Sequence, residues 1–338
     1  STTVLHLVFD TLLSVSPADR TRPMFVACND TLVESPVVTE YTRNALAHVE
    51  AGAEALGLPI TVHRTRPEHD QTFWVNMLGR GYPAPNRVFR WCTDRMKIRP
   101  TGKLLSGRVD QHGGAILLLG VRRAESANRA RTIDSHAVEG SRYNPHGSIR
   151  GCLVYNPIVD LADDEVWQFL LQVRPPWGGT HKPLVTLYRN ALGGECPFVV
   201  ANDDAPSCGT SSPRFGCWTC TVVKKDRSLE GLADNLDDDR LDALVAFRDR
   251  LREVSDDPKH RCTTRRNGLR GLGPLTYEAR AMLLDELLAL QAETGLSLID
   301  ETEVGEVRRT WDFDKVRDVV RETNRFLDVM RELEALDP

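Results

Sequence analysis

The sequence predicts an α/β protein with a doubly wound, mainly parallel sheet, followed by a cysteine-rich loop region and a helical C-terminal part. Two observations predict the sheet: short apolar runs alternate with longer amphipathic ones, and glycine and proline mark the boundaries between them. A third, the helical periodicity of the residues after 229, predicts the C-terminal part. With 338 residues, 41% of them hydrophobic, the chain can fill a substantial core.

The first half of the chain alternates helices and strands. Apolar side chains on one stripe predict a helix over residues 3–15, and a second helix is expected over 35–57, with Ser35 as its N-cap and Gly57 as its stop. A sheet of this kind binds ligands beyond the carboxyl ends of its strands, so the polar segments that follow the strands are candidate site segments. The strands are expected at residues 23–28, 59–65 and 113–121.

The charge balance excludes a strong global attraction to nucleic acid. The chain has 43 basic and 48 acidic residues, for a net charge of −5, so any such contact must come from local patches. No apolar run has the length of a membrane span, and the apolar start is interrupted by His6 and Asp10 and lacks the basic leader of a signal peptide. We therefore expect a cytoplasmic protein without membrane contact. In that compartment its eight cysteines favour metal binding or catalysis over disulfides.

Four of those cysteines crowd into one loop-forming segment. They are spaced C-x11-C-x8-C-x2-C among proline, glycine and aspartate residues, so we interpret them as metal ligands rather than as small core residues. A structural zinc site usually takes two C-x2–4-C pairs, whereas one such pair is present here. The wider spacing of the other two favours an iron–sulfur cluster, with zinc as the alternative. The expected ligands are Cys196, Cys208, Cys217 and Cys220.

A basic segment surrounds another cysteine. In FRWCTDRMKIRP, residues 89–100, four cations flank Cys92 and predict an anion site near one edge of the sheet. Neighbouring cations lower the pKa of a thiol, so Cys92 is a candidate catalytic residue that could carry a persulfide, with Lys97 as a second. A half-buried thiol beside Trp91 is the alternative interpretation. The four cations are Arg90, Arg95, Lys97 and Arg99.

Three blocks of the sequence resemble a known family. FRWCTDRMKIRP, GVRRAESANR (120–129) and VYNPIVDLADDEVWQFL (154–170) are similar to successive blocks of the phosphoadenosine-phosphosulfate reductase family, within the PP-loop ATP pyrophosphatase superfamily. The resemblance implies an adenine nucleotide alpha-hydrolase-like fold that binds ATP with Mg²⁺. It also implies a catalytic role for Arg122, because cations at such a site neutralise phosphate charge. The expected nucleotide-binding residues are Ser1, Thr2, Asn29, Asp30, Gly120, Arg122 and Arg123.

The phosphate-binding loop of that superfamily is largely missing from the sequence. Members carry an S-G-G-x-D-S loop between the first strand and the first helix, whose backbone N–H groups hold the pyrophosphate of ATP. Here Ser1 and Thr2 match the end of such a loop. We expect a strand and the rest of the loop to precede Ser1. The alternative is a chain that truly starts here and is inactive on ATP.

The cysteine region extends the resemblance. LYRNALGGECPF (187–198), RFGCWTC (214–220) and GPLTYEARAMLLDELLALQ (273–291) are similar to the DndC-type DNA phosphorothioation proteins. In that group four cysteines hold a [4Fe–4S] cluster, sulfur comes from a cysteine desulfurase, and other phosphorothioation proteins are partners.

The function that this resemblance implies is ATP-dependent. It is that of an adenylating iron–sulfur sulfurtransferase that helps replace a non-bridging phosphate oxygen of DNA by sulfur. Three other functions stay open: a sulfonucleotide reductase, a tRNA-thiolating enzyme, and a cluster-bearing binding module without ATP chemistry.

The C-terminal part carries a basic segment of its own. Residues 258–271, PKHRCTTRRNGLRG, contain no acid, which is typical either of a solvated loop or of a contact with a phosphate backbone. We divide the chain into a PP-loop ATP pyrophosphatase domain (1–180), a cluster-binding region (181–228) and a helical C-terminal region (229–338). The expected DNA-binding residues are Arg265, Arg266 and Arg270.

Overall fold

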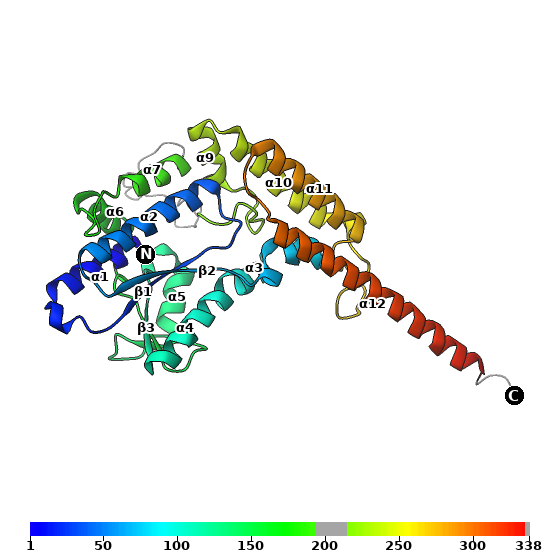
Figure 1. Ribbon diagram of the computed structural model, residues 1–338, viewed down its shortest axis with the longest axis horizontal. Coiled ribbons are helices and arrows are strands. Elements are labelled where there is room, and N and C mark those ends of the chain that lie inside the picture. The colour runs from blue at the N-terminus through cyan, green and yellow to red at the C-terminus, as the bar shows by residue number, and fades with distance from the viewer. Residues whose placement is uncertain (193–214, 335–338) are drawn as a thin grey trace.

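Figure 1 shows the protein as a computed structural model, in which residues 1–192 and 215–334 are described. Strands lie in the first half of the chain, and the second half is helical (Figure 1). The strands are β1 (Met24–Asn29), β2 (Ile60–Thr65), β3 (Ala115–Leu118), β4 (Asn144–Pro145) and β5 (Cys152–Tyr155). The main helices are α1 (Thr2–Ser14), α2 (Pro36–Ala55), α3 (Trp91–Thr93), α4 (Arg99–His112), α5 (Ala127–Ser135), α6 (Asp163–Gln172), α7 (Lys182–Ala191), α9 (Arg227–Leu236), α10 (Asp239–Asp256), α11 (Tyr277–Thr294) and α12 (Glu301–Glu334).

The strands pair as the sequence predicts, but in two separate sheets. β1 and β2 are parallel, with Met24 opposite Ile60, and β3 is parallel to β5, which also pairs with the short antiparallel strand β4. The parallel pairing is therefore confirmed. A single continuous doubly wound sheet is not seen among the residues that the structure describes.

Helices cover both faces of the β1–β2 pair. Val26 of β1 packs with Phe9 of α1 and Val49 of α2 in one apolar cluster. Phe25 points the other way, because side chains alternate along a strand, and the guanidinium of Arg108 in α4 lies over its ring at 4.1 Å. Helices α1 and α2 thus lie on one face of this pair and α4 on the other.

One glycine fixes how closely α2 approaches the segment after α6. A Cβ at Gly52 would come within 2.6 Å of the Cα of Trp177, so no other residue fits without moving the backbone. Trp177 in turn packs its ring edge-on against Phe9 at 5.1 Å. This contact holds α1, α2 and the chain before α7 together.

The C-terminal helices pack against a buried helical turn of the first half, η3 (Val75–Gly79). Trp74 donates its indole N–H to the carbonyl of Leu298 at 2.8 Å, and Trp311 of α12 donates to Leu78 at 2.7 Å. The main hydrophobic cluster draws residues from all three segments into which the sequence was divided. In Figure 1, α12 continues outward beyond this core, away from the strands.

No helix in the two described stretches combines the length and the apolar character needed to cross a membrane.

Two buried histidines link α1 to α7. Nε2 of His181 lies 3.4 Å from Nδ1 of His6, and Nε2 of His6 lies 3.3 Å from a carboxylate oxygen of Asp10. The rings of Phe169 and Trp177 pack against His6. Burial lowers the pKa of both imidazoles, and in His6 the carboxylate of Asp10 opposes this only in part.

We expect this pair to make the protein less stable in mild acid. The folded pKa of each histidine is below its unfolded value, so the unfolded chain binds more protons there, and the stability present above about pH 6.5 is lost as the pH falls. Thermal unfolding from about pH 7 to about pH 5 should show a fall of a few degrees that His181→Gln reduces. The exposed His48 is the matched control, as His48→Gln should leave the pH dependence unchanged.

Candidate functional site

The Cys217–Cys220 pair forms a tight turn that is fixed to the chain after β1. The N–H of Cys220 donates to the carbonyl of Cys217 at 3.0 Å, and Cys217 forms an antiparallel bridge with Glu34. The N–H of Trp218 donates to Val33 at 2.9 Å, and the indole is only 2% exposed. The turn therefore lies near the carboxyl end of β1, where a fold of this class binds its ligands.

The thiol of Cys217 is buried and unusually weak as an acid. Burial raises its pKa to about 11, and the nearby ammonium of Lys97 opposes the shift only in part. The hydroxyl of Thr31 lies 3.2 Å from the sulfur. A thiol in this state stays protonated at neutral pH unless a cation such as a metal ion replaces the proton.

Cys92 lies on α3 within electrostatic range of both thiols of the pair. Burial raises the pKa of Cys92, and the neighbouring thiol of Cys220 raises it further. Cys92 in turn raises the pKa of Cys217. The pKa of Cys92 is therefore raised, and not lowered as the flanking Arg90 and Arg95 predicted, with burial as the largest cause.

The flanking cations have other partners. Arg95 donates to the hydroxyl of Tyr82 at 3.0 Å and also to the side chain of Gln71, while Arg99 pairs with Asp94 at 2.7 Å. Burial raises the pKa of both Cys217 and Glu34, and the charge of Lys97, which belongs to this segment, opposes the rise in each. The segment thus supplies one cation to the thiol site.

The other two predicted ligands, Cys196 and Cys208, lie outside the described residues. Within the described ranges, no group of three or more His, Cys, Asp or Glu side chains lies close enough together to hold a single metal ion.

Arg248 of α10 fastens the segment after the cysteine turn. Its side chain is 1% exposed, and it donates to the carbonyls of Cys220 at 2.8 Å and Lys224 at 3.1 Å, as well as to that of Val223. Asp249 supplies a carboxylate at 2.6 Å. Sequence analysis missed Arg248, although an arginine four residues after Leu244, on the apolar stripe of a helix, was a signal.

A second group of predicted residues surrounds the end of β1. The side-chain oxygen of Asn29 accepts from the hydroxyls of Thr65 at 2.6 Å and Thr101 at 2.7 Å. Asp30 accepts from the N–H of Leu32 and pairs with Arg66 at 2.9 Å. A shallow hollow opens beside them, lined by Cys28, Asn29, Asp30, Glu34, Thr39, Thr42, Arg43 and Arg64.

Ser1 and Gly120 come together at the end of β3. A Cβ at Gly120 would lie 2.7 Å from the backbone nitrogen of Ser1, so glycine is required where α1 begins, with Thr2 as its first residue. Arg122, which is close enough to lower the pKa of the Ser1 amino group, pairs with Asp163 at 2.5 Å.

Arg123 is directed to different partners. It pairs with Asp134 at 3.0 Å and also with Asp160. The predicted nucleotide residues thus form one group at β1 and another at β3, and each arginine already has an acidic partner. A phosphate that binds either arginine has to compete with these carboxylates.

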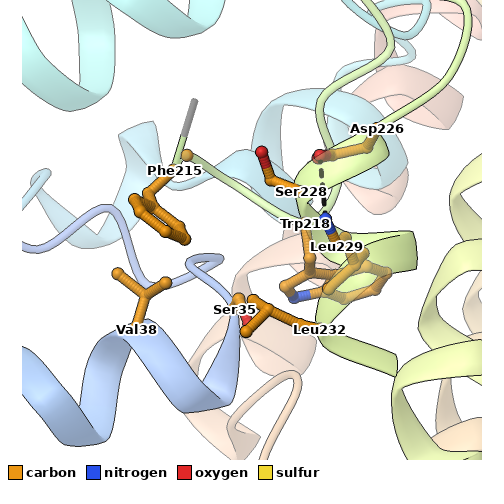
Figure 2. Close-up of a pocket in the computed structure, with 9 residues that line it drawn as sticks. Ser35, Val38, Phe215, Trp218, Asp226, Ser228, Leu229 and Leu232 are labelled. Atoms are coloured by element: carbon orange, nitrogen blue, oxygen red, sulfur yellow. Dashed lines mark hydrogen bonds between the residues drawn. The ribbon is translucent and has the colours of Figure 1, made fainter. Parts of the chain in front are cut away.

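Figure 2 shows a small hollow behind the cysteine turn, between α2 and α9. Phe215, Trp218 and Leu232 give it apolar walls, and Asp226 caps α9 by accepting from the N–H of Leu229 at 3.1 Å. Ser35 lines it with a buried hydroxyl that has no hydrogen-bond partner in the described part of the chain, so the expected side-chain cap of α2 does not form. Trp218, which lines the hollow, is buried and holds the cysteine turn in place.

The predicted DNA-binding residues lie on an arm between α10 and α11. The bridges Arg261↔Leu275 and Thr264↔Arg270 hold its two sides together. All three arginines are exposed, and the guanidinium of Arg266 also lies over the ring of Tyr82 at 4.5 Å and donates to a backbone carbonyl. The structure therefore gives Arg266 a packing role that the other two arginines do not have.

The comparison with protein families identifies the chain. The model of the phosphoadenosine phosphosulfate reductase domain matches residues 29–223, which is more than half of the sequence. The matched range includes the end of β1, Cys92, the Cys217–Cys220 turn and the arginines after β3. No curated protein matches the chain significantly. The protein is therefore a member of the phosphoadenosine phosphosulfate reductase domain family, which indicates a nucleotide-binding enzyme of sulfur metabolism.

Proposed function

We propose that the protein is an ATP-dependent iron–sulfur sulfurtransferase that helps replace a non-bridging phosphate oxygen of DNA by sulfur. The observation that carries the proposal is the position of the Cys217–Cys220 turn beside the hollow at the end of β1. Glu34 belongs to both, since it bridges to Cys217 and lines the hollow. A sulfur carrier and an activated phosphate have to meet in such an arrangement.

The thiols that would hold a [4Fe–4S] cluster are Cys92, Cys217 and Cys220, with the fourth ligand supplied by Cys196 or Cys208. We include Cys92 because Cys220 raises its pKa and Cys92 in turn raises the pKa of Cys217. As a ligand it would not have the catalytic role that its flanking cations suggested. Such a cluster, when bound, would supply one-electron redox chemistry at a potential set by its ligands and by hydrogen bonds to its sulfurs. The Thr31 hydroxyl and the Lys97 ammonium favour the thiolate of Cys217 that ligation requires.

ATP activates the phosphate oxygen that has to leave. An oxygen of a phosphodiester attacks the α-phosphorus of ATP, with Mg²⁺, and pyrophosphate leaves. A thiol reductant cleaves the desulfurase persulfide to hydrosulfide and is itself oxidised to a disulfide. The hydrosulfide then attacks the adenylated phosphorus, a proton is lost and AMP departs with the activated oxygen, so that one oxygen is exchanged for one sulfur. Cations at the ends of β1 and β3, including Arg122, stabilise the phosphate charge as it moves. We propose a cysteine desulfurase as sulfur donor, other phosphorothioation proteins as partners, and the cytoplasm as the location.

The direct test combines anaerobic protein, a cysteine desulfurase, cysteine, a thiol reductant such as dithiothreitol, ATP, Mg²⁺ and DNA. We expect pyrophosphate release that depends on DNA, and phosphorothioate dinucleotides in the nuclease digest by mass spectrometry. Sulfite released from an adenylyl sulfate would instead identify a sulfonucleotide reductase, and thiolated tRNA a tRNA-modifying enzyme. If ATP is not consumed with any of these acceptors, the protein is a binding module.

Asp30→Asn is expected to slow pyrophosphate release at least tenfold while the protein stays folded. The amide keeps the oxygen that accepts from Leu32, but loses the charge that pairs with Arg66 beside the hollow. A single-turnover assay with labelled ATP measures the change. Asp110→Asn, an exposed acid on α4, is the control, and equal rates for both variants would move the nucleotide away from β1.

Changing both Arg265 and Arg270 to Ala is expected to weaken DNA binding equally for all sequences. Contacts with phosphates carry no base information, and each one lost lowers the slope of log affinity against log salt by about 0.9. Fluorescence anisotropy across a salt series measures both effects. Arg266→Ala is a poor substitute, because it also removes the packing on Tyr82. An unchanged slope would identify the arm as a solvated loop.

A further inference from the structure

A rigid turn at residues 86–90 presents an apolar tip to solvent. Val88 is 96% exposed, the highest value for a large hydrophobic side chain in the described part of the chain, and Phe89 beside it is 43% exposed. An isolated exposed valine is ordinary on a protein surface. Three further features distinguish this turn from an ordinary surface loop.

The first feature is that the tip is held without help from the Val88 side chain. The side-chain oxygen of Asn86 accepts from the N–H groups of Val88 at 2.9 Å and Phe89 at 2.8 Å, and the N–H of Asn86 donates to the carbonyl of Phe89 at 3.2 Å. An asparagine that closes its own turn in this way fixes the backbone locally. The isopropyl group of Val88 therefore contributes nothing to the fold and projects from a fixed base.

The second feature is the charge around the tip. Arg87 and Arg90 are both exposed, one on each side of the two apolar residues, and residues 86–93 contain no acid. The Tyr82 ring connects this turn to the basic arm, because Phe89 packs edge-on against it at 5.9 Å and Arg266 lies over it at 4.5 Å.

The acid that acts on Arg266 does not neutralise this surface. Asp314 is already held by Arg280 at 3.0 Å and by Arg317 at 2.7 Å. The arm itself, residues 258–275, contains no acid. Lys259 of the arm pairs with Asp257 at 2.8 Å, so the cations left around the two exposed apolar side chains are those of the turn and of the arm's tip. They are Arg87, Arg90, Arg265, Arg266 and Arg270, and their complement is a polyanion with an apolar interior.

The third feature is the connection to the thiol site. The turn leads within two residues from Arg90 to Cys92, and Trp91 between them is buried, with its indole N–H donating to Pro83 at 2.9 Å. A ligand that rests on Val88 is therefore placed by a short, anchored segment relative to the thiols.

We propose that the Asn86–Arg90 turn is a wedge that inserts Val88 between base pairs of duplex DNA while Arg87 and Arg90 hold the flanking phosphates. This rests on the proposed function, in which DNA accepts the sulfur. Apolar wedges flanked by cations unstack a base step and bend the duplex, which exposes the backbone at that step. The wedge would thus choose deformable steps and present their phosphates to the sulfur site.

The test measures affinity and bending separately, with the full chain carrying its cluster and a short end-labelled duplex. Val88→Ser should weaken binding about tenfold at every salt concentration, because an apolar contact is lost without a change in charge. Arg87→Ala should instead lower the salt slope by about 0.9. Energy transfer between the labelled ends should report a bend with the unchanged protein that Val88→Ser abolishes. Leu171→Ser and Arg174→Ala, exposed residues at the end of α6, are the matched controls.

The outcomes separate this inference from the proposed function. If Val88→Ser binds and bends the duplex like the unchanged protein while DNA-dependent pyrophosphate release persists, the wedge is overturned and the function stands. If the unchanged protein binds RNA or a protein through this turn and does not bind duplex DNA, the wedge and the DNA acceptor both fall. If Val88→Ser and Arg87→Ala both change only the slope of log affinity against log salt, the surface binds phosphates alone and the wedge is again overturned.

Discussion

Cys217→Ser and Cys220→Ser are each expected to lose the bound iron and to abolish sulfur incorporation. Protein purified without oxygen should be brown, with about four irons and four acid-labile sulfides per chain, and each serine variant should be colourless. Serine is a poor ligand for iron in this setting, and the turn has a fixed geometry that no neighbouring side chain can replace. Metal analysis and the phosphorothioate assay measure the two effects.

Matched variants make this result specific. Cys28→Ser and Cys152→Ser, which lie on β1 and β5, should keep the iron. Among Cys92, Cys196 and Cys208, two should be required for iron and one should not. If Cys92→Ser keeps its iron but no longer modifies DNA, Cys92 is a sulfur carrier and the ligands are the four cysteines of the loop. Stoichiometric zinc in place of iron would rule out the cluster.

Arg248→Met is expected to reduce the free energy of unfolding by about 3–5 kcal/mol, because it leaves the carbonyls of Cys220 and Val223 without their hydrogen-bond donor. The backbone after Cys220 depends on this guanidinium, so the iron content should fall as well. Chemical denaturation of the protein with and without iron measures both effects.

Arg252 provides the comparison for that result. It also donates to the carbonyl of Lys224, but its side chain is 34% exposed, so Arg252→Ala should cost at most about 1 kcal/mol. Similar midpoints for the Arg248 and Arg252 variants would show that burial of Arg248 contributes little. A stable Arg248→Met protein that loses iron would make the arginine a positioning residue only.

Local patterns in the sequence predicted α1, α2, three of the strands and the helical character of the C-terminal part. The capping signals placed α2 within about two residues, since Pro36 begins it and Gly57 follows it with a positive φ of 61°. The three expected strands are present as β1, β2 and β3. Which strands share a sheet was not predictable in the same way, because pairing depends on contacts far apart in the chain.

The sequence suggested candidate residues for the site, but it did not show the burial of their side chains or the partners that they contact. The sequence shows that Arg90 and Arg95 flank Cys92, yet it does not show that Arg95 turns to Tyr82 or that the thiol is buried. Thr31 and Arg248 were missed for a related reason. Thr31 lies 186 positions from Cys217, and Arg248 lies 28 positions from Cys220. The apolar stripe of α10 marks Arg248 as buried, but no local pattern shows which residues it contacts.

The hydrogen bonds of Trp74 and Trp311 join positions that are 224 and 233 residues apart. During synthesis, the turn Val75–Gly79 therefore waits for its packing partners until almost the whole polypeptide has left the ribosome. Trp91, which precedes Cys92, belongs to the same core and waits with it. The segment that carries Cys92 therefore reaches its final packing only after most of the chain has been translated.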